Sequence, residues 1–159
     1  MKTLIMLTGV PGMGKSSWAR RYAATHPNVL IVDTDEVRKS ITGDYHVFPE
    51  DRRVIYDKMS DMASAWFAAH EGECTVIEDS TFTDNYRREY YMRRIKGQDY
   101  SILHMCKLHD YARCFAQNKM RKQEKWVPDE VIQNFIDHYE EPSEEVRRLF
   151  DRIEVDYWD

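Results

Sequence analysis

The stretch Gly9-Val-Pro-Gly-Met-Gly14-Lys15-Ser16 decides the fold that we expect for this chain. It fits the pattern G-x-x-x-x-G-K-[ST] without a mismatch. It follows a short apolar run, Lys2 to Leu7, and precedes a helix pattern that runs from Lys15 to about Thr25. A glycine-rich turn between a buried strand and a helix is typical of a loop that wraps phosphate groups. The sequence therefore predicts a phosphate-binding loop near the N-terminus.

The residue types in this stretch match what a triphosphate requires. Glycines let backbone N–H groups approach the β-phosphate, and the following helix aims its positive end at the same anion. We expect Lys15 to reach the β- and γ-phosphates and the Ser16 hydroxyl to ligate Mg²⁺. We therefore predict a site for Mg²⁺ and for ATP or another nucleoside triphosphate, formed by Gly9, Gly12, Met13, Gly14, Lys15, Ser16 and Ser17.

Strand and helix patterns alternate along the rest of the chain. Apolar runs predict further strands at 29–32, 74–77 and 100–106, and a last strand at 152–157. Helices are expected at 35–41, 50–70, 84–96 and 110–121, and from Pro128 to about Tyr139. This alternation favours a parallel sheet covered on both faces. We predict one α/β domain over residues 1–159, with five parallel strands and the P-loop NTPase fold.

Composition narrows the class of protein. None of the 159 residues belongs to an apolar run near the ~20 residues of a membrane span, so we expect no membrane association. Three cysteines without paired spacing favour a reducing, cytoplasmic setting. The net charge is −5, but residues from Asp137 onward carry nine acidic and three basic side chains. The remainder is nearly neutral, with local basic stretches that permit an anionic substrate.

Polar side chains follow the second predicted strand, at the end of the sheet where ligands bind in open α/β folds. Asp33 and Asp35 are two residues apart and share a side if the strand continues, and Arg38 lies one turn further. We expect Asp35 to accept the proton of an attacking hydroxyl, with Asp33 beside the acceptor. Arg38 is expected to grip a phosphate or sugar of that acceptor. Asp35 also suits a helix cap, a role compatible with catalysis.

Two further segments supply candidates for metal binding and for transfer. Asp79 ends the third predicted strand and is expected to position Mg²⁺ through water, and Thr81 to touch the acceptor. The basic stretch from Asn118 to Lys125 joins two predicted helices. A lid at this place, about 117–127, would set an arginine on the transferring phosphoryl group. The alternative is a solvated helix end.

The chain resembles the 5′-kinase domain of phage-type polynucleotide kinases, within a larger group of P-loop kinases that includes zeta toxins and small-molecule phosphotransferases. The resemblance spans most of the chain and is carried by 9–20, 35–41, 76–81, 87–88 and 118–132. It implies a nucleoside-kinase-like fold with a helical lid. It also implies Lys15, Asp35, Arg38 and Arg121 as catalytic residues, with Asp35 as general base and Arg121 as the lid arginine, and an acceptor held by Asp33, Arg38, Thr81 and Arg88.

Several functions stay open, because Gln117 and Phe82 depart from that family's usual residues and these 159 residues include no phosphatase domain. The leading hypothesis is an ATP-dependent kinase of a 5′-hydroxyl on a DNA or RNA end. The alternatives are a kinase of hydroxymethylated bases in phage-type DNA, a small-molecule kinase for a nucleoside, sugar or antibiotic, and a nucleotide-binding switch. No motif indicates a protein partner.

Two sets of residues bear on the choice between these acceptors. We expect the acceptor gate, residues 43–53, to border the acceptor. Aromatic side chains that stack on bases are typical of proteins that bind single strands. The candidates for such stacking are Tyr86, Tyr90, Tyr91 and Trp126, although helical tyrosines often serve packing alone.

Overall fold

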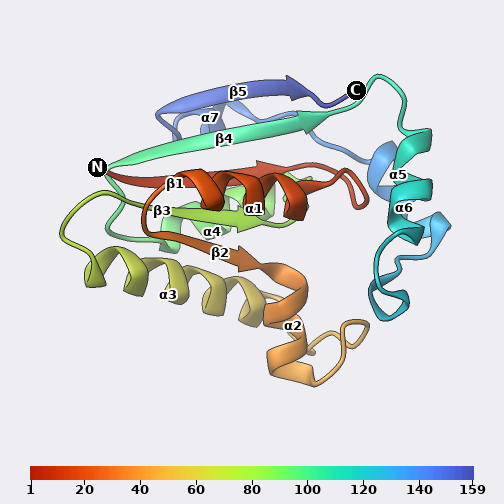
Figure 1. Cartoon of the computed structure of the whole chain (residues 1–159), viewed down its shortest axis with the longest axis horizontal. Coiled ribbons are helices and arrows are strands. Elements are labelled where there is room, and N and C mark those ends of the chain that lie inside the picture. Colours follow the sequence, from red (N-terminus) through yellow and green to blue (C-terminus); the bar gives the residue numbers. More distant parts are fainter.

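Five parallel strands form the sheet of the computed structural model, which describes all 159 residues. The strands are β1 (Lys2–Thr8), β2 (Val29–Asp33), β3 (Cys74–Asp79), β4 (Tyr100–Lys107) and β5 (Arg152–Tyr157). They lie in the order β2-β3-β1-β4-β5, with β1 in the centre. The predicted α/β fold with a five-stranded parallel sheet is confirmed. All strands end at the same edge of the sheet, which lies on the right in Figure 1.

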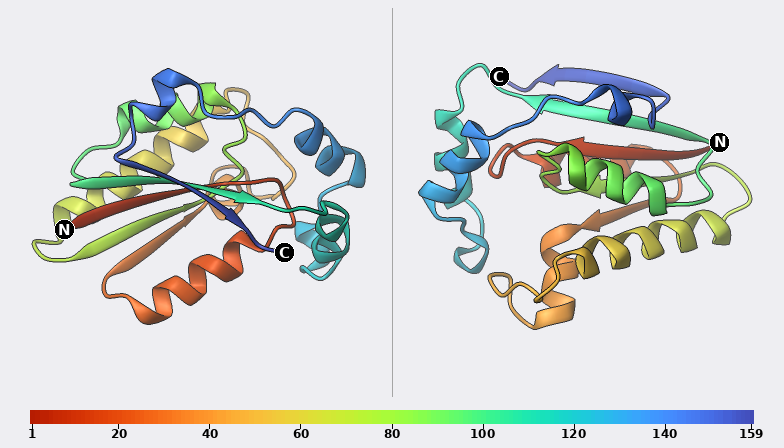
Figure 2. Two further views of the ribbon diagram at one scale, coloured as in Figure 1. Left: turned by 90° about the horizontal axis from the view of Figure 1, so that it is seen from above. Right: turned by 180° about the vertical axis from the view of Figure 1, so that it is seen from behind.

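Helices cover both faces of this sheet. They are α1 (Lys15–Thr25), α2 (Thr34–Thr42), α3 (Arg53–Ala69), α4 (Asn85–Arg94), α5 (Ala112–Lys119), α6 (Asp129–Asp137) and α7 (Glu144–Arg147), with a 3-10 helix η1 (Gln123–Lys125). The two views of Figure 2 show α1 on one face and α3, α4 and α7 on the other. Helices α2, α5 and α6 lie toward the carboxyl ends of the strands (Figure 1). None of the helices has both the length and the apolar character needed to cross a membrane.

Alternate residues of β1 enter two different cores. Leu4 and Met6 pack with residues of α3, α4 and α7, whereas Ile5 and Leu7 pack with residues of α1, α5 and α6. All four side chains are at most 3% exposed. Burial on both faces explains why this strand is an uninterrupted apolar run. Burying each of these side chains contributes about 1.5–3 kcal/mol, so β1 is a firm base for the loop that follows it.

Helix α2 is capped by Asp33 rather than by Asp35. The Oδ1 atom of Asp33 accepts hydrogen bonds from the backbone N–H groups of Asp35, at 2.8 Å, and Glu36, at 3.4 Å. The chain therefore turns into a helix directly after β2. The expectation that Asp33 and Asp35 share one side of a continued strand is wrong, because Asp35 belongs to the first turn of α2.

Several elements differ in length from their predicted bounds. Helix α3 begins at Arg53 rather than near Glu50, and the Asp51 side chain accepts a hydrogen bond from the Arg53 N–H at 3.0 Å. Helix α5 runs from Ala112 to Lys119 rather than over 110–121, and the segment before α6 contains only the short η1. The one-turn helix α7 is absent from the prediction, because a four-residue helix is too short to show periodicity.

Candidate active site

The phosphate loop, residues 9–16, lies tightly against α5. Gly12 and Gly14 have φ angles of 86° and 95°, in the left-handed region that favours glycine. A Cβ atom at Gly12 would lie 2.4 Å from the carbonyl oxygen of Cys114, so a larger residue would force the loop away from α5. Gly14 precedes α1, and no side chain caps that helix. The first N–H groups of α1 are therefore left for an anion.

Lys15 is folded back over this loop. Its Nζ atom donates hydrogen bonds to the carbonyl oxygens of Gly9, at 3.0 Å, and Val10, at 2.8 Å. The side chain is buried, and this burial lowers the pKa of Lys15, while the negative charges of Asp79 and Asp35 act in the opposite direction. A buried ammonium group beside the uncapped N-terminus of α1 is suited to hold phosphate oxygens.

The residues expected to hold Mg²⁺ are brought together. The Ser16 hydroxyl donates a hydrogen bond to Oδ2 of Asp79 at 2.5 Å, although the two residues are 63 positions apart in the chain. Asp79 is the last residue of β3 and is buried. A hydroxyl and a carboxylate are hard oxygen donors, the kind that Mg²⁺ binds in proteins. Their position beside the phosphate loop therefore fits a metal ion that also contacts phosphate oxygens.

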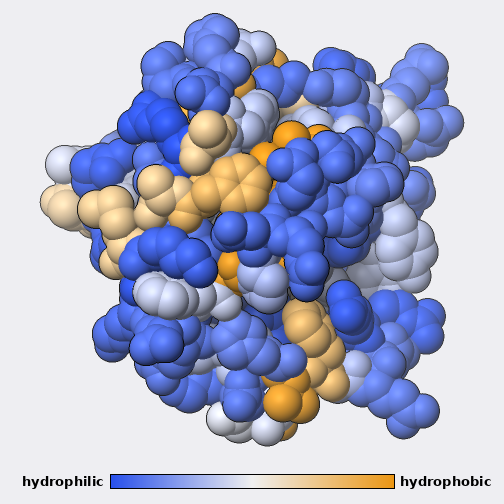
Figure 3. Space-filling view, turned by 90° about the vertical axis from the view of Figure 1, so that its right-hand side faces the viewer, coloured by the Kyte–Doolittle hydropathy of each residue, from blue (hydrophilic) through white to orange (hydrophobic).

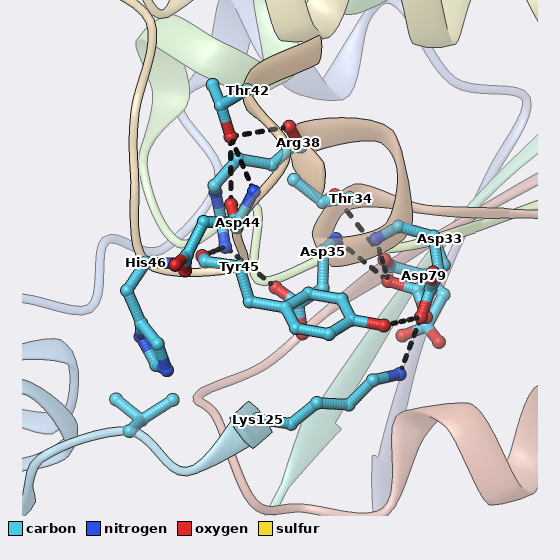
Figure 4. Close-up of polar contacts among 12 residues, drawn as sticks. Asp33, Thr34, Asp35, Arg38, Thr42, Asp44, Tyr45, His46, Asp79 and Lys125 are labelled. Carbon is cyan, nitrogen blue, oxygen red and sulfur yellow. Dashed lines mark hydrogen bonds and ion pairs between the residues drawn. The ribbon is translucent and has the colours of Figure 1, made fainter. Parts of the chain in front are cut away.

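Asp35 lies between two arginines from different parts of the chain. Its Oδ1 atom is 3.2 Å from the Arg38 guanidinium, one helical turn further along α2. Its Oδ2 atom is 2.9 Å from Nη2 of Arg121, which follows α5. Arg38 also donates to the carbonyl oxygen of Tyr45 at 2.7 Å, so its direction is fixed from two sides. Figure 4 shows Asp35 and Arg38 on α2, with Tyr45 beside them.

Asp33 differs from Asp35 in its electrostatic surroundings. It is opposite Asp79 in the register of β2 and β3. Burial, followed by the nearby charges of Asp79 and Asp35, raises the pKa of Asp33 to about 6. Its carboxyl group therefore holds the start of α2 in place and titrates close to neutrality.

One cavity of about 1340 Å³ joins all these groups, since Lys15, Ser16, Asp35, Asp79 and Arg121 line it together. Eleven basic side chains line this cavity but only four acidic ones, although the whole chain has a net charge of −5. Figure 3 shows that the face toward which the strands end is largely hydrophilic. The basic excess is therefore concentrated where an anionic ligand would bind.

A network of polar contacts joins the lid segment, residues 120–127, to α2 and the acceptor gate. Lys125 Nζ lies 2.7 Å from Oε1 of Glu36, and the same oxygen accepts a hydrogen bond from the Tyr45 hydroxyl at 2.6 Å. Nε2 of His46 is 2.8 Å from the carbonyl oxygen of Glu124. Figure 4 shows Lys125 reaching from the lid segment past the Tyr45 ring. The lid segment and the gate thus close one side of the cavity together.

Asn118 fixes the base of the lid segment. It is fully buried, its Nδ2 donates to the Val127 carbonyl oxygen at 2.7 Å, and its Oδ1 accepts from the Val127 N–H at 3.0 Å. One amide side chain therefore ties the end of α5 to the start of α6. The segment between them is held at both ends.

Two of the expected site residues do not reach the cavity. Arg88 is fully buried, and its guanidinium donates to the Phe82 carbonyl oxygen at 2.6 Å and to the Thr8 hydroxyl at 3.0 Å. These bonds hold the backbone of Phe82, whose φ is 40°. Arg88 therefore has a structural role, and its neighbour Arg87 lines the cavity instead. Gly9 is also outside the lining, because its N–H donates to the Thr81 carbonyl oxygen at 2.9 Å.

The remaining expected residues line the cavity. They are Gly12, Met13, Gly14, Ser17, Asp33, Arg38 and Thr81. Of the aromatic candidates, Tyr86 and Tyr90 line the cavity, whereas Tyr91 is fully buried and Trp126 is outside the lining.

Sequence reasoning missed four residues of the lining that stand out in the structure. Phe48 lies between the guanidinium groups of Arg38 and Arg52, at 4.3 Å and 4.1 Å from its ring centre. Asp156 and Trp158 enter the cavity from the end of β5. An aromatic residue beside basic ones in the acceptor gate was the available signal for Phe48 and Arg52. Nothing in the spacing of β5 links it to the phosphate loop.

A family model described as an AAA domain matches residues 4–142 of this chain. Among solved structures, a gluconokinase from Sinorhizobium meliloti 1021 matches with a TM-score of 0.65 and 16% sequence identity, covering 98% of this chain and 82% of that one. Kti12 from Chaetomium thermophilum, in complex with ADP-AlF3, matches with a TM-score of 0.66 and 17% identity, covering 98% and 89%.

A chain of the Pnkp1/Rnl/Hen1 RNA repair complex matches with a TM-score of 0.60 and 19% identity. This match covers 94% of the present chain and 46% of the other one. At such identities these three likenesses show a shared fold, that of the P-loop kinases, and the acceptor has to be argued from the site.

Proposed function

Because this chain belongs to the AAA domain family, whose model matches residues 4–142, and has a P-loop kinase fold, we propose that it transfers the γ-phosphate of ATP to the 5′-hydroxyl of a polynucleotide. The family and the fold indicate a phosphotransferase of the P-loop kinase type. The residues that line the cavity favour a polynucleotide acceptor.

One observation carries the proposal: the phosphate loop and Asp35 line the same cavity, with Arg121 beside Asp35. A triphosphate held by the loop and by Lys15 would place its γ-phosphoryl group in the space that Asp35 faces. An acceptor hydroxyl between the two would be close both to a proton acceptor and to the phosphorus atom. Such positioning supplies a large part of catalysis in phosphoryl transfer.

The chemical step can be assigned to residues of this chain. The acceptor oxygen forms a bond to the γ-phosphorus while the bond to the β,γ-bridging oxygen breaks, and the nucleoside diphosphate leaves. Asp35 accepts the proton of the hydroxyl. Arg121 stabilises the charge on the transferring group, which requires it to exchange its contact with Asp35 for one with phosphoryl oxygens. When bound at Ser16 and Asp79, Mg²⁺ would neutralise charge on the β- and γ-phosphates.

The rim of the cavity on the Asp35 side supports a polynucleotide acceptor. Phe48 is 42% exposed and is flanked by Arg38 and Arg52, and Tyr86 is 64% exposed. The Tyr86 and Tyr90 rings stack with their centres 6.1 Å apart, and Arg87 lies between them in sequence. Interleaved arginines and exposed aromatic rings are the surface that single-stranded nucleic acids bind, through phosphates and stacked bases.

The acceptor can be tested directly with γ-labelled ATP and Mg²⁺. The protein is incubated separately with a DNA or RNA oligonucleotide that has a 5′-hydroxyl, with DNA that contains hydroxymethylated bases and blocked ends, and with nucleosides and sugars. The matched control is the same oligonucleotide with a 5′-phosphate already attached. We expect label only in the 5′-hydroxyl oligonucleotide. Label in the blocked DNA or in the small molecules alone would contradict the proposed acceptor.

A further inference from the structure

The cavity extends past the phosphate loop to the side away from Asp35. In the sheet order β2-β3-β1-β4-β5, Asp35 follows β2 on one side of β1, so the acceptor occupies that side. On the other side the cavity is lined by Leu108, which follows β4, and by Asp156 and Trp158 at the end of β5. Trp18 of α1 and Arg113 of α5 complete this part of the lining. None of these five residues has a role in the transfer step described above.

Trp158 is held in a fixed orientation at the end of β5. Its backbone N–H donates to the Lys107 carbonyl oxygen at 3.0 Å, which continues the pairing of β4 and β5. Its indole Nε1–H donates to Oδ2 of Asp156 at 2.9 Å. The ring is inclined by only 12° to that of Trp18, with ring centres 6.4 Å apart. A rigid aromatic surface therefore borders the cavity at this end.

Asp156 places a hydrogen-bond acceptor beside that surface. Its Oδ2 accepts the Trp158 indole N–H, whereas no side chain or backbone group donates to its Oδ1. The buried His104 is within 3.4 Å of Oδ2 and packs against Trp18, with ring centres 4.9 Å apart. An ionised carboxylate only accepts hydrogen bonds, so its free oxygen would attract an N–H group and repel a carbonyl oxygen.

We propose that Trp158 and Asp156 form the site for the nucleobase of the donor, and that Asp156 selects adenine through its 6-amino group. The indole supplies a surface on which the base stacks, and Oδ1 of Asp156 accepts a hydrogen bond from the amino group. The triphosphate then extends from this end of the cavity along the phosphate loop toward Asp35. This inference rests on the proposed use of a nucleoside triphosphate as donor, and it adds which base that donor carries.

The test compares binding of ATP, GTP, ITP and inorganic tripolyphosphate by calorimetry, at one Mg²⁺ and one salt concentration. GTP and ITP carry a carbonyl oxygen at C6, where ATP carries the amino group, and tripolyphosphate probes the phosphate loop alone. Stacking on an aromatic side chain is worth about 1–3 kcal/mol per base, so ATP should bind roughly tenfold or more tightly than tripolyphosphate. Trp158→Leu should reduce ATP binding to the level of tripolyphosphate, and Trp158→Phe should retain most of it.

Asp156→Asn tests the selection of the amino group, because asparagine still accepts the Trp158 N–H but is no longer charged. The wild-type protein should bind ATP several-fold more tightly than GTP and ITP. The variant should lose this preference, because the amide N–H that replaces the free oxygen can donate to the C6 carbonyl oxygen of GTP and ITP. Trp66→Phe, outside the cavity lining, is the matched control and should change nothing.

Two results would overturn the inference. If the wild-type protein bound ITP as tightly as ATP, Asp156 would not select the base. If Trp158→Leu left the affinity for ATP unchanged, the base would not stack on Trp158. In both cases tripolyphosphate binding and phosphate transfer would persist, so the proposed function would stand. Absence of binding by tripolyphosphate and by every nucleotide would contradict the donor site itself.

Discussion

Asp33 and Asp35 show how two identical side chains, two positions apart, acquire different roles. Asp33 is the last residue of β2, and its Oδ1 accepts hydrogen bonds from the first N–H groups of α2. That capping orients the first turn of α2, and Asp35 on this turn faces Arg38 and Arg121. We propose Asp35 as the proton acceptor for the hydroxyl, and its side chain is held in contact with two guanidinium groups. Asp33 is therefore a positioning residue for Asp35.

The raised pKa of Asp33 predicts how stability depends on pH. Its folded-state value of about 6 exceeds the ordinary value of 3.8, so between these values the folded state binds more protons than the unfolded state. Asp33 therefore makes the free energy of unfolding fall as pH rises from about 4 to 6. Asp33→Asn keeps the cap and removes the titration, so the variant should gain roughly 1–3 kcal/mol relative to wild type across this range. Urea denaturation at a series of pH values measures the difference, and a difference that does not vary with pH would refute the prediction.

At the scale of elements, the lid segment and α2 are joined through Glu36. Its Oε1 binds both Lys125 and the Tyr45 hydroxyl, so one carboxylate connects the lid segment, α2 and the acceptor gate. Glu36→Gln removes the charge that attracts Lys125. The lid segment should then open more often, and trypsin should cleave after Lys122 and Lys125 several-fold faster than in the wild-type protein.

The matched control for this prediction is Glu144→Gln. Glu144 forms an ion pair with Arg148 at 2.6 Å, but both side chains are more than 60% exposed and lie away from the lid segment. Its loss should leave the cleavage rate unchanged, because exposed ion pairs contribute little. Equal cleavage of both variants and the wild-type protein would show that Glu36 does not hold the lid segment.

Asn118 provides a second prediction at this scale. Asn118→Ala leaves the N–H and the carbonyl oxygen of Val127 without their partner. The cost is about 1–3 kcal/mol for a fully buried group and less for these two groups, which are partly buried. We therefore expect a loss of roughly 2–4 kcal/mol in the free energy of unfolding, measured by urea denaturation. Gln133→Ala, on the exposed side of α6, should cost less than about 0.5 kcal/mol. A similar small loss for both variants would contradict the role assigned to Asn118.

The elements could be predicted from the sequence where local patterns determine them. Four strands follow from apolar runs, β5 from an alternation of polar and apolar residues, and the phosphate loop from one motif of fixed spacing. The cap at Asp33 could not be distinguished from one at Asp35, because both residue types and positions suit a cap. Arg88 was misassigned because a charged residue rarely enters a core, yet it shares a helix face with Tyr91 and Met92 at spacings of three and four. That spacing is the signal that favours burial.

Other parts of the site depend on contacts between distant segments. Arg52, Phe48 and Trp158 line the cavity because the 43–53 segment and the end of β5 meet the phosphate loop in space. The sequence has an aromatic residue beside basic ones in the 43–53 segment, but no pattern shows that this segment or the end of β5 meets the phosphate loop. The motif therefore predicted the donor half of the site, whereas the acceptor rim and the proposed base site required the fold.

For the whole molecule, the central position of β1 divides the cavity into two functional halves. Strands β3 and β2 lead to Asp79 and Asp35 on one side, and β4 and β5 lead to Leu108, Asp156 and Trp158 on the other (Figure 1). In the proposed use of the cavity, the sheet sets the order acceptor, phosphoryl group, triphosphate and base along it. The rigidity of this arrangement depends on the two cores that pack against the sheet.

One buried acid lies within that packing and makes the stability of the whole molecule depend on pH. Glu78 on β3 is fully buried, its Oε1 accepts the Tyr91 hydroxyl, and burial raises its pKa well above the ordinary value. Since the folded state holds this proton to higher pH than the unfolded state, stability falls as pH rises above about 4.5. Glu78→Gln removes the titration, so the melting temperature of the variant should exceed that of wild type increasingly from pH 5 to pH 9. Parallel melting curves of the two proteins over this range would contradict the assignment.

The central claim is that Asp35 accepts the proton of a hydroxyl that attacks a triphosphate held by the phosphate loop. The most direct test is the single-turnover rate of phosphate transfer from ATP to a 5′-hydroxyl oligonucleotide by Asp35→Asn, with ATP affinity measured in parallel and Asp137→Asn as control. Loss of a general base costs about 10²–10⁴-fold in rate, so transfer by Asp35→Asn should fall by that factor while its ATP affinity stays within about threefold of wild type. Transfer at the wild-type rate by Asp35→Asn would contradict the account.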